Sequence, residues 1–311
     1  MKTESFSIIP LEALLTSDLH RFTLHRDISA DLSVDFLTSI KRYGLFHPPV
    51  VMGTDTAYQV ICGSRRIQAL QIIGNVESVF CRVVEISDSA ELLATIYEDQ
   101  RLSGPLSTIM TARFVKLTDS LLAQESRAPL IKLLKLGSYG QLQRLLPLLA
   151  LEQSIRDAIH NGAISDKIGL VFCSISPEDR LFLCELFMAL SLNKNKQKRL
   201  VDMCQILSAQ KGGTFKNLFH ENFREYLPEN ITTNRPQTAG NLLRVLHEAS
   251  HPLINNAEKL FNDRKNELEL PADCSLSHSP AFEKDRVTLS FDFENFDEMA
   301  RIWQKIKNHF E

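Results

Sequence analysis

One segment decides the fold of the first hundred residues: Val60-Ile61-Cys62-Gly63-Ser64-Arg65-Arg66-Ile67-Gln68-Ala69. It opens with an apolar run of strand character, in which we expect Val60 and Cys62 on one face and Ile61 on the other. The run ends at Gly63, and a helical pattern follows with Ser64 as its predicted N-cap. The sequence therefore predicts a strand, a tight turn and a helix, in this order.

The start of the predicted helix has the features of an anion site. The first backbone N–H groups of a helix have no partner within it, and the guanidinium groups of Arg65 and Arg66 belong to the same turn. The alternative is that both arginines are solvated residues, although arginine at a helix N-terminus opposes the macrodipole. Spacing alone leaves both interpretations open.

The composition of the chain is that of an ordinary globular protein. With 311 residues, the chain is long enough for two or three domains. Hydrophobic residues make up 44% and charged residues 23%, which excludes a disordered chain. No apolar run is long enough to span a bilayer, and the first residues lack the apolar core of a signal peptide, so we expect a cytoplasmic protein without membrane contact.

Cysteine spacing and net charge narrow the classes of site. The six cysteines lie far apart without a Cys-x-x-Cys pair, and the nine histidines do not cluster, so we expect reduced core cysteines and no zinc-type site. The net charge of −3 disfavours a general polyanion-binding surface. Any contact with nucleic acid must therefore come from a confined basic patch.

The order of strand and helix patterns predicts an α+β chain with three parts. Strand patterns stop before Gly104-Pro105, and helical periodicity dominates after it. We therefore predict a small mixed-sheet domain over 1–104, an all-helical domain over 105–232, and a small α/β unit over 233–311. The last unit is predicted as helix-strand-helix, with a loop over 271–281. One face of its strand is apolar, which favours a packing or dimerisation role for the unit.

The helical domain contains a candidate helix-turn-helix over 128–151. Helical patterns over 128–136 and 139–149 flank Gly137-Ser138, a spacing that also fits a plain helical hairpin. The polar residues of its second helix, which would contact DNA, are few, and Pro147 interrupts the pattern. They are Gln141, Gln143 and Arg144.

The most basic run of the chain follows further on and opens another predicted helix. It contains Lys194, Lys196, Lys198 and Arg199. Such a run is either a solvated helix start or a set of phosphate contacts. We predict modest DNA affinity centred on these residues and Arg144.

The first hundred residues resemble the N-terminal domain of the ParB partition-protein family. The resemblance rests on the ordered segments 36–44, 48–51 and 58–66, and 148–165 is similar to the segment after the family's helix-turn-helix. It implies a ParB/sulfiredoxin-like fold, a DNA-binding helical domain and a cytoplasmic homodimer on a nucleoid or plasmid. It also implies a partition ATPase as partner.

The resemblance also implies a nucleotide site. In the family, a Gly-Glu-Arg-Arg box holds the triphosphate of CTP, and a later Glu-Asn-x-x-Arg box adds a magnesium ligand. The matching cofactor positions are Gly63, Ser64, Arg65, Arg66, Gln100 and Arg101, and the Mg²⁺ ligand would be Glu98 or Asp99. Because Ser64 stands where the family has Glu, we expect binding of CTP with Mg²⁺ and weak hydrolysis at most.

Two other functions stay open at this point. The same fold resembles sulfiredoxin and related phosphotransfer proteins, so an enzyme that uses Cys62 is one alternative. The other is a degenerate relative of the family that acts only through protein partners. The acidic net charge and Pro147 favour this last interpretation.

Overall fold

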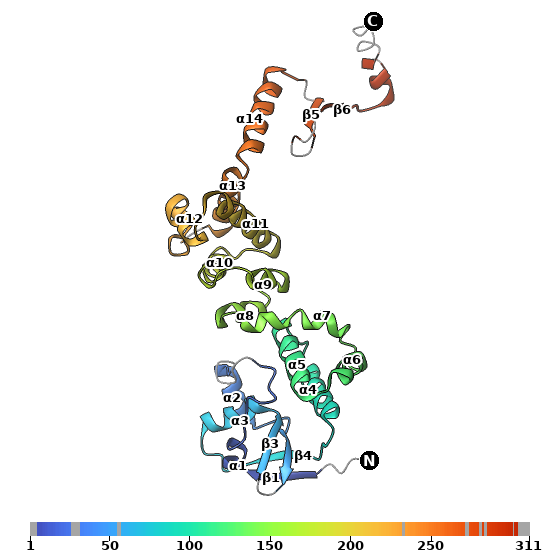
Figure 1. Ribbon diagram of the computed structural model, residues 1–311, viewed down its shortest axis with the longest axis vertical. Coiled ribbons are helices and arrows are strands. Elements are labelled where there is room, and N and C mark those ends of the chain that lie inside the picture. Colours follow the sequence, from blue (N-terminus) through green and yellow to red (C-terminus); the bar gives the residue numbers. More distant parts are fainter. Residues whose placement is uncertain are drawn as a thin grey trace. The chain divides into compact units, whose positions relative to one another are not determined.

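The computed structural model describes residues 5–25, 32–54, 57–231, 234–270, 274–279, 282, 285–300 and 302–303 (Figure 1). The chain divides into two compact units, Met1–Met188 and Ala189–Glu311. The three-domain division expected from the sequence stays a prediction.

A four-stranded mixed sheet forms the centre of the first unit. Its strand order is β1-β4-β2-β3, with β1 (Ser5–Pro10) antiparallel to β4 (Ser78–Val84). The strands β2 (Val50–Thr54) and β3 (Ala57–Cys62) form an antiparallel pair, and β2 runs parallel to β4. The parallel pair requires a crossover, which α3 (Ser64–Ile73) provides between β3 and β4.

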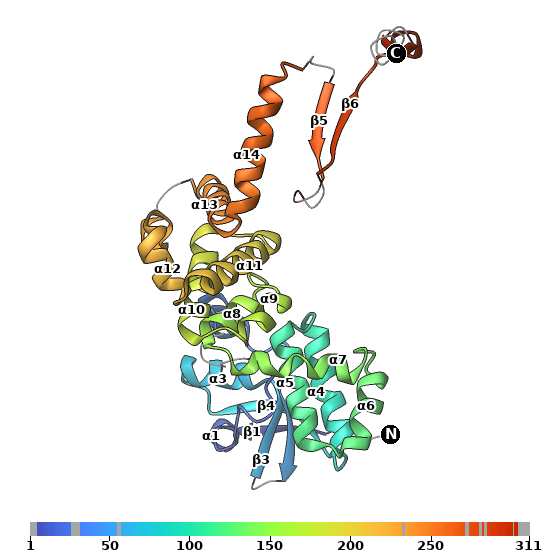
Figure 2. The same ribbon diagram turned by 45° about the horizontal axis from the view of Figure 1, so that its top comes forward.

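Both faces of the sheet are packed against helices. One face buries Val51, Val60 and Cys81 against α3, α1 (Leu11–Leu15) and α2 (Val34–Tyr43). The helices α1 and α3 lie on one side of the strands and α4 to α6 on the other (Figure 2). Burial on both sides gives this sheet its own hydrophobic core.

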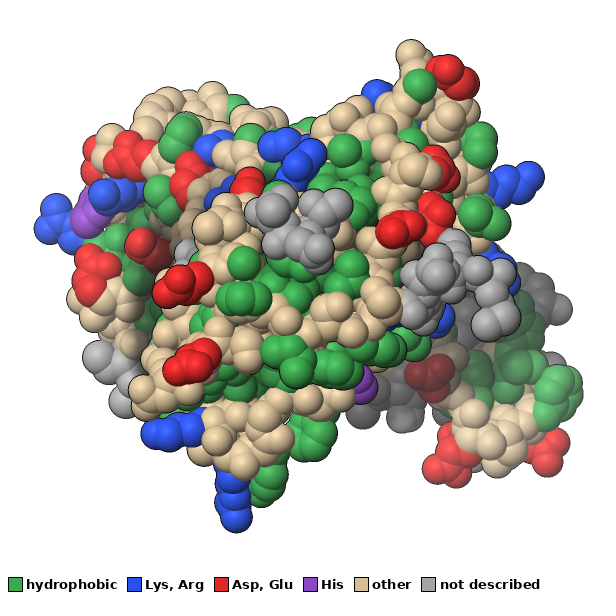
Figure 3. Space-filling model, turned by 90° about the horizontal axis from the view of Figure 1, so that it is seen from below, with side chains coloured by type: hydrophobic (Ala, Val, Ile, Leu, Met, Phe, Trp, Pro, Cys, Tyr) green, Lys and Arg blue, Asp and Glu red, His purple; other side chains and the backbone are tan. Residues whose placement is uncertain are grey.

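The second face packs against the helices that follow the sheet in the chain. Val50, Ile61 and Val84 contact residues of α4 (Ser89–Ser103), α5 (Thr108–Leu121) and α6 (Gln124–Leu133). Asp88 caps α4 by accepting from the N–H groups of Ala90 and Glu91. This face is not covered along β1, and hydrophobic side chains reach the surface in the view from below (Figure 3).

The prediction that Cys62 lies on the same face of the strand as Val60 is wrong. The register of β2 and β3 shifts between Val50 and Val51, so Val51 pairs with Val60 and Val50 pairs with Cys62. This irregularity inserts Ile61 as an extra residue, and Cys62 therefore packs in the same core cluster as Ile61, opposite Val60. Strict alternation cannot anticipate a bulge at the end of a strand.

The candidate helix-turn-helix has a shorter second helix than predicted. The helix α7 spans Tyr139–Gln143 only, and the 3-10 turn η1 spans Leu146–Ala150 with Pro147 in its first positions. The continuous helix expected over 139–149 is wrong because proline cannot donate to the preceding turn. The chain continues with α8 (Gln153–His160), α9 (Asp166–Phe172) and α10 (Pro177–Leu190), and the division between the two units falls near the end of α10.

The second unit consists of helices followed by a two-stranded hairpin. Its elements are α11 (Lys194–Lys211), α12 (Phe215–Asn222), η2 (Arg224–Tyr226), η3 (Pro228–Asn230), α13 (Arg235–Ser250), α14 (Pro252–Glu267), β5 (Cys274–His278) and β6 (Val287–Phe291). The sequence predicts a loop over 271–281, and this prediction is wrong for Cys274–His278, which form β5 and pair antiparallel with β6. The Ser and His residues of β5 show no strand pattern in the sequence, so its structure depends on the pairing with β6. The closing helix predicted over 297–310 falls largely outside the described residues.

The predicted fold class is confirmed. A small mixed sheet opens the chain, helices make up its middle, and a small unit of helices and strands ends it. Within the part of the chain that the structure describes, no helix combines the length and apolar character needed to cross a bilayer.

Candidate nucleotide site

Gly63 forms the turn between β3 and α3. Its φ of 93° lies in the left-handed region, and a Cβ at this position would come within 3.1 Å of Pro49 Cα and 3.2 Å of the Arg66 guanidinium. The left-handed dihedral therefore favours glycine, and the close contacts leave little room for a side chain. Gly63 itself is the N-cap of α3, so the N-cap predicted at Ser64 is wrong: Ser64 is the first helical residue and is buried.

Arg66 ties the turn to the loop before β2. Its Nη1 donates to the carbonyl oxygens of His47 (2.6 Å) and Pro48 (3.3 Å), and its Nη2 lies 3.8 Å from Oδ1 of Asp99. The side chain is only 19% exposed. An arginine in this position organises three chain segments and still carries further N–H donors.

Arg65 takes a different direction from its neighbour. Its guanidinium carbon lies 5.2 Å from the centre of the Phe36 ring on α2, in a cation–π contact. The two arginines thus start from one helical turn and reach different elements. Together with the αL glycine and the helix N-terminus, they concentrate positive charge at one end of α3.

Asp99 brings the end of α4 to this turn. Besides its contact with Arg66, it hydrogen-bonds with the thiol of Cys62, which is buried at 5% exposure. Burial is the main cause that raises the pKa of the Cys62 thiol far above its usual range, and the negative charge of Asp99 adds to the rise. Cys62 therefore stays protonated, which does not favour the enzyme alternative.

Glu98 is engaged elsewhere. Its Oε2 accepts from Nε (2.7 Å) and Nη2 (2.6 Å) of Arg101 within α4, while Gln100 is half-buried between them in the sequence. Successive positions on a helix do not face one another, so Glu98 and Asp99 cannot both ligate one ion. Among the described residues, no group of three or more His, Cys, Asp or Glu side chains is placed to hold a metal. Mg²⁺ would fit here with one carboxylate, that of Asp99, only if phosphate and water completed its ligand sphere.

The predicted DNA contacts of the helix-turn-helix lie on the surface of the first unit. Gln141, Gln143 and Arg144 are all exposed, and Nε2 of Gln143 donates to the hydroxyl of Tyr139 at 3.1 Å. That hydroxyl hydrogen-bonds with Asp119 on α5, which also pairs with Arg127 on α6 at 3.4 Å. These bonds fix the short helix α7 on α5 and α6.

The basic run opens α11 in the second unit. Lys194, Lys198 and Arg199 are exposed and Lys196 is half-exposed. The side chain of Asn193 caps the helix by accepting from the N–H of Lys196, and no acidic residue lies in the first turn. Lys194 and Lys196 lie in the first turn and oppose the helix macrodipole, so intrinsic helix stability does not explain them.

Three partners of the site were not anticipated from the sequence. They are the carbonyl groups of His47 and Pro48, which accept from Arg66, and the Phe36 ring under Arg65. Backbone acceptors leave no trace in residue type. The pair Pro48-Pro49 is the one signal that points to a rigid loop here.

The first hundred residues of the chain match a family of known proteins. Residues 5–100 match the family model of the ParB N-terminal domain, so the resemblance predicted from 36–66 is confirmed. A probable chromosome-partitioning protein ParB of Campylobacter jejuni subsp. jejuni is 26% identical over 170 residues, 54% of this chain and 59% of the relative. A nucleoid occlusion protein of Shouchella clausii is 29% identical over 151 residues, 48% of this chain and 51% of the relative. The chain thus spans between half and three fifths of the length of these curated relatives.

Solved structures give weaker likenesses. The C-terminally truncated chromosome-partitioning protein ParB of Caulobacter crescentus, complexed to the centromeric parS site, is 21% identical with a TM-score of 0.34, over 62% of this chain and 97% of that chain. Its complex with CTP-gamma-S is 22% identical with a TM-score of 0.26, over 56% of this chain and 94% of that chain. These scores are too low to transfer the ligands of that protein to this chain.

Proposed function

We propose that this chain, a ParB-family protein by its N-terminal domain, is a nucleotide-responsive DNA-binding protein of chromosome or plasmid partition or of nucleoid occlusion. The observation that carries the proposal is the turn at Gly63, where an αL glycine, a helix N-terminus and two arginines meet. We infer that it binds the triphosphate of CTP, with Asp99 as the carboxylate nearest to a bound Mg²⁺.

Arg66 supplies the link between nucleotide and conformation. Its guanidinium is shared between the carbonyl groups of the loop before β2 and the Asp99 carboxylate. A phosphate is a stronger acceptor than a carbonyl and takes bidentate hydrogen bonds from arginine. Phosphate binding would therefore draw Arg66 away from His47 and Pro48 and release that loop. We infer that the nucleotide reorganises the domain, and that turnover is slow because Ser64 offers no carboxylate.

A titration with labelled CTP and Mg²⁺ tests the nucleotide site on the full chain. We expect saturable binding that Arg66→Ala and Arg65→Ala each weaken at least about tenfold, since a charge-assisted hydrogen bond contributes about 1.5–3 kcal/mol. Arg42→Ala, on the neighbouring helix α2, is the matched control and should leave the affinity unchanged. No binding by the wild type, or undiminished binding after Arg66→Ala, would exclude the nucleotide site.

The DNA contacts are proposed on two elements. The exposed lysines and arginine of α11 would bind phosphates, and the exposed polar residues of α7 would add contacts near Arg144. With only five residues in α7, base readout is limited, and phosphate contacts carry most of the affinity. We therefore expect binding that depends steeply on salt.

A gel-shift series on plasmid DNA at increasing salt tests these contacts. Lys198→Ala and Arg199→Ala should each reduce the slope of log affinity against log salt by about one. Lys211→Ala, at the opposite end of the same helix, is the matched control. Absence of binding even at low salt would favour the alternative in which the protein acts only through protein partners, including a partition ATPase.

A homodimer through the C-terminal unit completes the proposal. The strand β6 exposes Val287, Leu289 and Phe291, and its hairpin has only two strands. Such a hairpin is marginally stable in water, and a second copy would cover its apolar side chains. Sedimentation of the full chain at several concentrations tests this, with a monomer throughout as the excluding result.

A further inference from the structure

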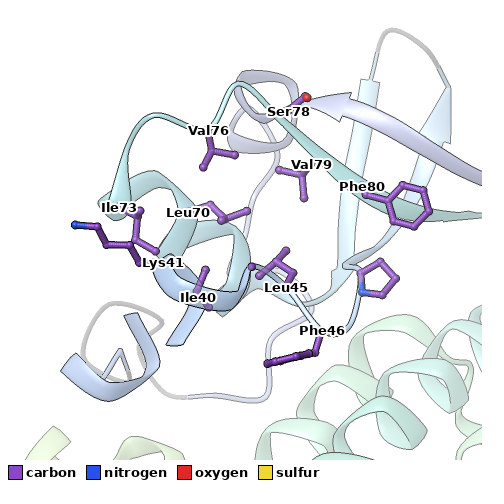
Figure 4. Close-up of a pocket in the computed structure, with 12 residues that line it drawn as sticks. Ile40, Lys41, Leu45, Phe46, Leu70, Ile73, Val76, Ser78, Val79 and Phe80 are labelled. Atoms are coloured by element: carbon purple, nitrogen blue, oxygen red, sulfur yellow. The ribbon is translucent and has the colours of Figure 1, made fainter. Parts of the chain in front are cut away.

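A groove opens at the end of α3 that lies away from Gly63. Its volume is about 520 Å³, and it lies between α2, α3, the loop after α2 and the start of β4 (Figure 4). Most of the lining is apolar and includes Ile40, Leu45, Leu70, Ile73, Val76 and Val79. The lining shares one residue with the proposed nucleotide site, Pro48, whose carbonyl oxygen accepts from Arg66.

Exposed aromatic side chains extend the apolar surface beyond the groove. Phe46 and Phe80 line it and are 75% and 55% exposed. Phe6 stacks on Phe80 with ring centres 5.2 Å apart, and Tyr43 lies 6.3 Å from Phe46. Exposed aromatic side chains that adjoin an apolar groove in this way mark an interaction site. Phe6 and Tyr43 lie outside the groove lining, so a ligand that covers them as well is larger than a small molecule confined to the groove.

The floor of the groove is an open strand edge. Strand β2 begins at Val50, opposite Arg82, so the first half of β4 has β1 on one side and the groove on the other. The N–H of Arg82 donates to the Pro49 carbonyl, on the β2 side. Because backbone groups alternate along a strand, the N–H and C=O groups of Ser78 and Phe80 face this same side, into the groove.

The charge at the rim is positive. Lys41 is the charged residue among the described residues that line the groove. Figure 4 shows it beside Ile73 at one end, with its ammonium group directed outward, while Phe46 and Phe80 lie away from that end. A ligand with an apolar side chain and a nearby carboxylate would match both features.

We propose that this groove binds an extended segment of a partner polypeptide. The segment adds a short strand to the open edge of β4 at Ser78 and Phe80, inserts an apolar side chain into the groove, and places an acidic side chain near Lys41. The site requires neither nucleotide nor DNA, so it stands independently of the proposed function.

Peptide selection tests the site directly. A displayed library of random peptides of about ten residues, long enough to cross the groove at about 3.3 Å per residue, is selected on the full chain. Peptides that also bind the Lys41→Glu/Phe46→Ala double variant are removed. We expect a consensus that alternates apolar residues and carries an acidic one. The synthetic consensus peptide should slow hydrogen exchange at the Phe80 amide.

Matched variants distinguish binding in the groove from nonspecific hydrophobic binding of the peptide. Phe46→Ala should weaken binding of the consensus peptide about fivefold or more, and Lys41→Glu about fivefold. Ile72→Ala, an exposed apolar residue of α3 outside the groove, and Lys116→Glu, an exposed lysine of α5, should each change it less than about twofold.

Three results would overturn the inference. The first is a selection without enrichment, and the second is a peptide that binds without protecting the Phe80 amide. The third is protection of Phe80 that rises with protein concentration in the absence of peptide, which would assign the surface to a second copy of the chain.

Discussion

The sheet of the first unit and the hairpin of the second show how one pattern has two outcomes. Both contain strands with alternating apolar residues. In the sheet, helices on both faces leave Val51 and Val60 with no exposed surface. In the hairpin, Val287, Leu289 and Phe291 remain 56%, 46% and 39% exposed. The strands β2 and β3 thus have their apolar residues covered by helices of the same unit, whereas the apolar residues of β6 stay exposed.

The largest effect on stability is expected when a side chain is removed from the core beneath the sheet. Phe114 on α5 is fully buried and lies 5.6 Å from the Tyr97 ring. Phe114→Ala should lower the free energy of unfolding by about 3–5 kcal/mol, because the cavity cannot collapse completely. Urea unfolding followed by circular dichroism measures it. Leu289→Ala in the hairpin is the control, with a change within about 0.5 kcal/mol at low protein concentration. Equal effects would contradict the contrast.

A second change strains the turn that joins the sheet to α3. Gly63→Ala forces a left-handed φ on alanine and places its Cβ 3.1 Å from Pro49. We expect a loss of about 1–3 kcal/mol in unfolding free energy and weaker CTP binding. Gly140→Ala is the matched control: this glycine is helical, a Cβ there meets nothing within 4 Å, and alanine should be neutral or stabilising. A Gly63→Ala protein as stable as the wild type would show that the turn can relax.

The role of the hairpin in the proposed dimer can be tested by changing one of its exposed apolar residues. Leu289→Ser removes an apolar side chain that a second copy would cover. We expect the dimer dissociation constant to rise about tenfold, since burying a leucine contributes about 1.5–3 kcal/mol. Sedimentation equilibrium measures it. Thr288→Ser, the adjacent residue of β6 on its opposite face, should leave it unchanged. The same effect from both variants would argue against a specific interface.

The smallest expected effect concerns two ion pairs, one in each unit. Glu152 accepts two bonds of 2.7 Å from Arg180, and this lowers the pKa of its carboxyl. The pair Arg244–Glu248 is as short but lies on the exposed surface of α13. Glu152→Gln should lower stability at neutral pH by about 1 kcal/mol, and Glu248→Gln by less than about 0.5 kcal/mol.

The pH dependence of the Glu152 pair follows from the direction of its pKa shift. A carboxyl whose folded pKa is lowered stabilises the protein above its ordinary pKa. This contribution disappears as the pH falls through the lowered folded value. The difference between wild type and Glu152→Gln should therefore be constant near neutral pH and vanish in acid. A difference that grows towards acid would contradict the assigned direction.

Much of the first domain was predictable because its signals are local. Gly63 followed by two arginines predicts a turn and a helix start, and Asp88 with Glu91 predicts the N-terminus of α4. The bulge that turns Cys62 to the other face and the role of Gly63 as N-cap were not predictable. Both depend on how β2 pairs with β3 and on space beside Pro49, which no spacing of residue types records.

The sequence by itself determined that a turn and a helix start follow β3, and its glycine, serine and two arginines predict an anion site there. Only the tertiary structure decided which contacts each of these residues makes. Arg66 holds the carbonyl groups of the loop before β2, Arg65 covers Phe36, and Asp99 approaches from α4. The tertiary structure also leaves the first half of β4 without a β2 partner, beside the apolar groove. Local chemistry is written in residue types, whereas contacts between distant segments and exposed strand edges arise only when the chain packs.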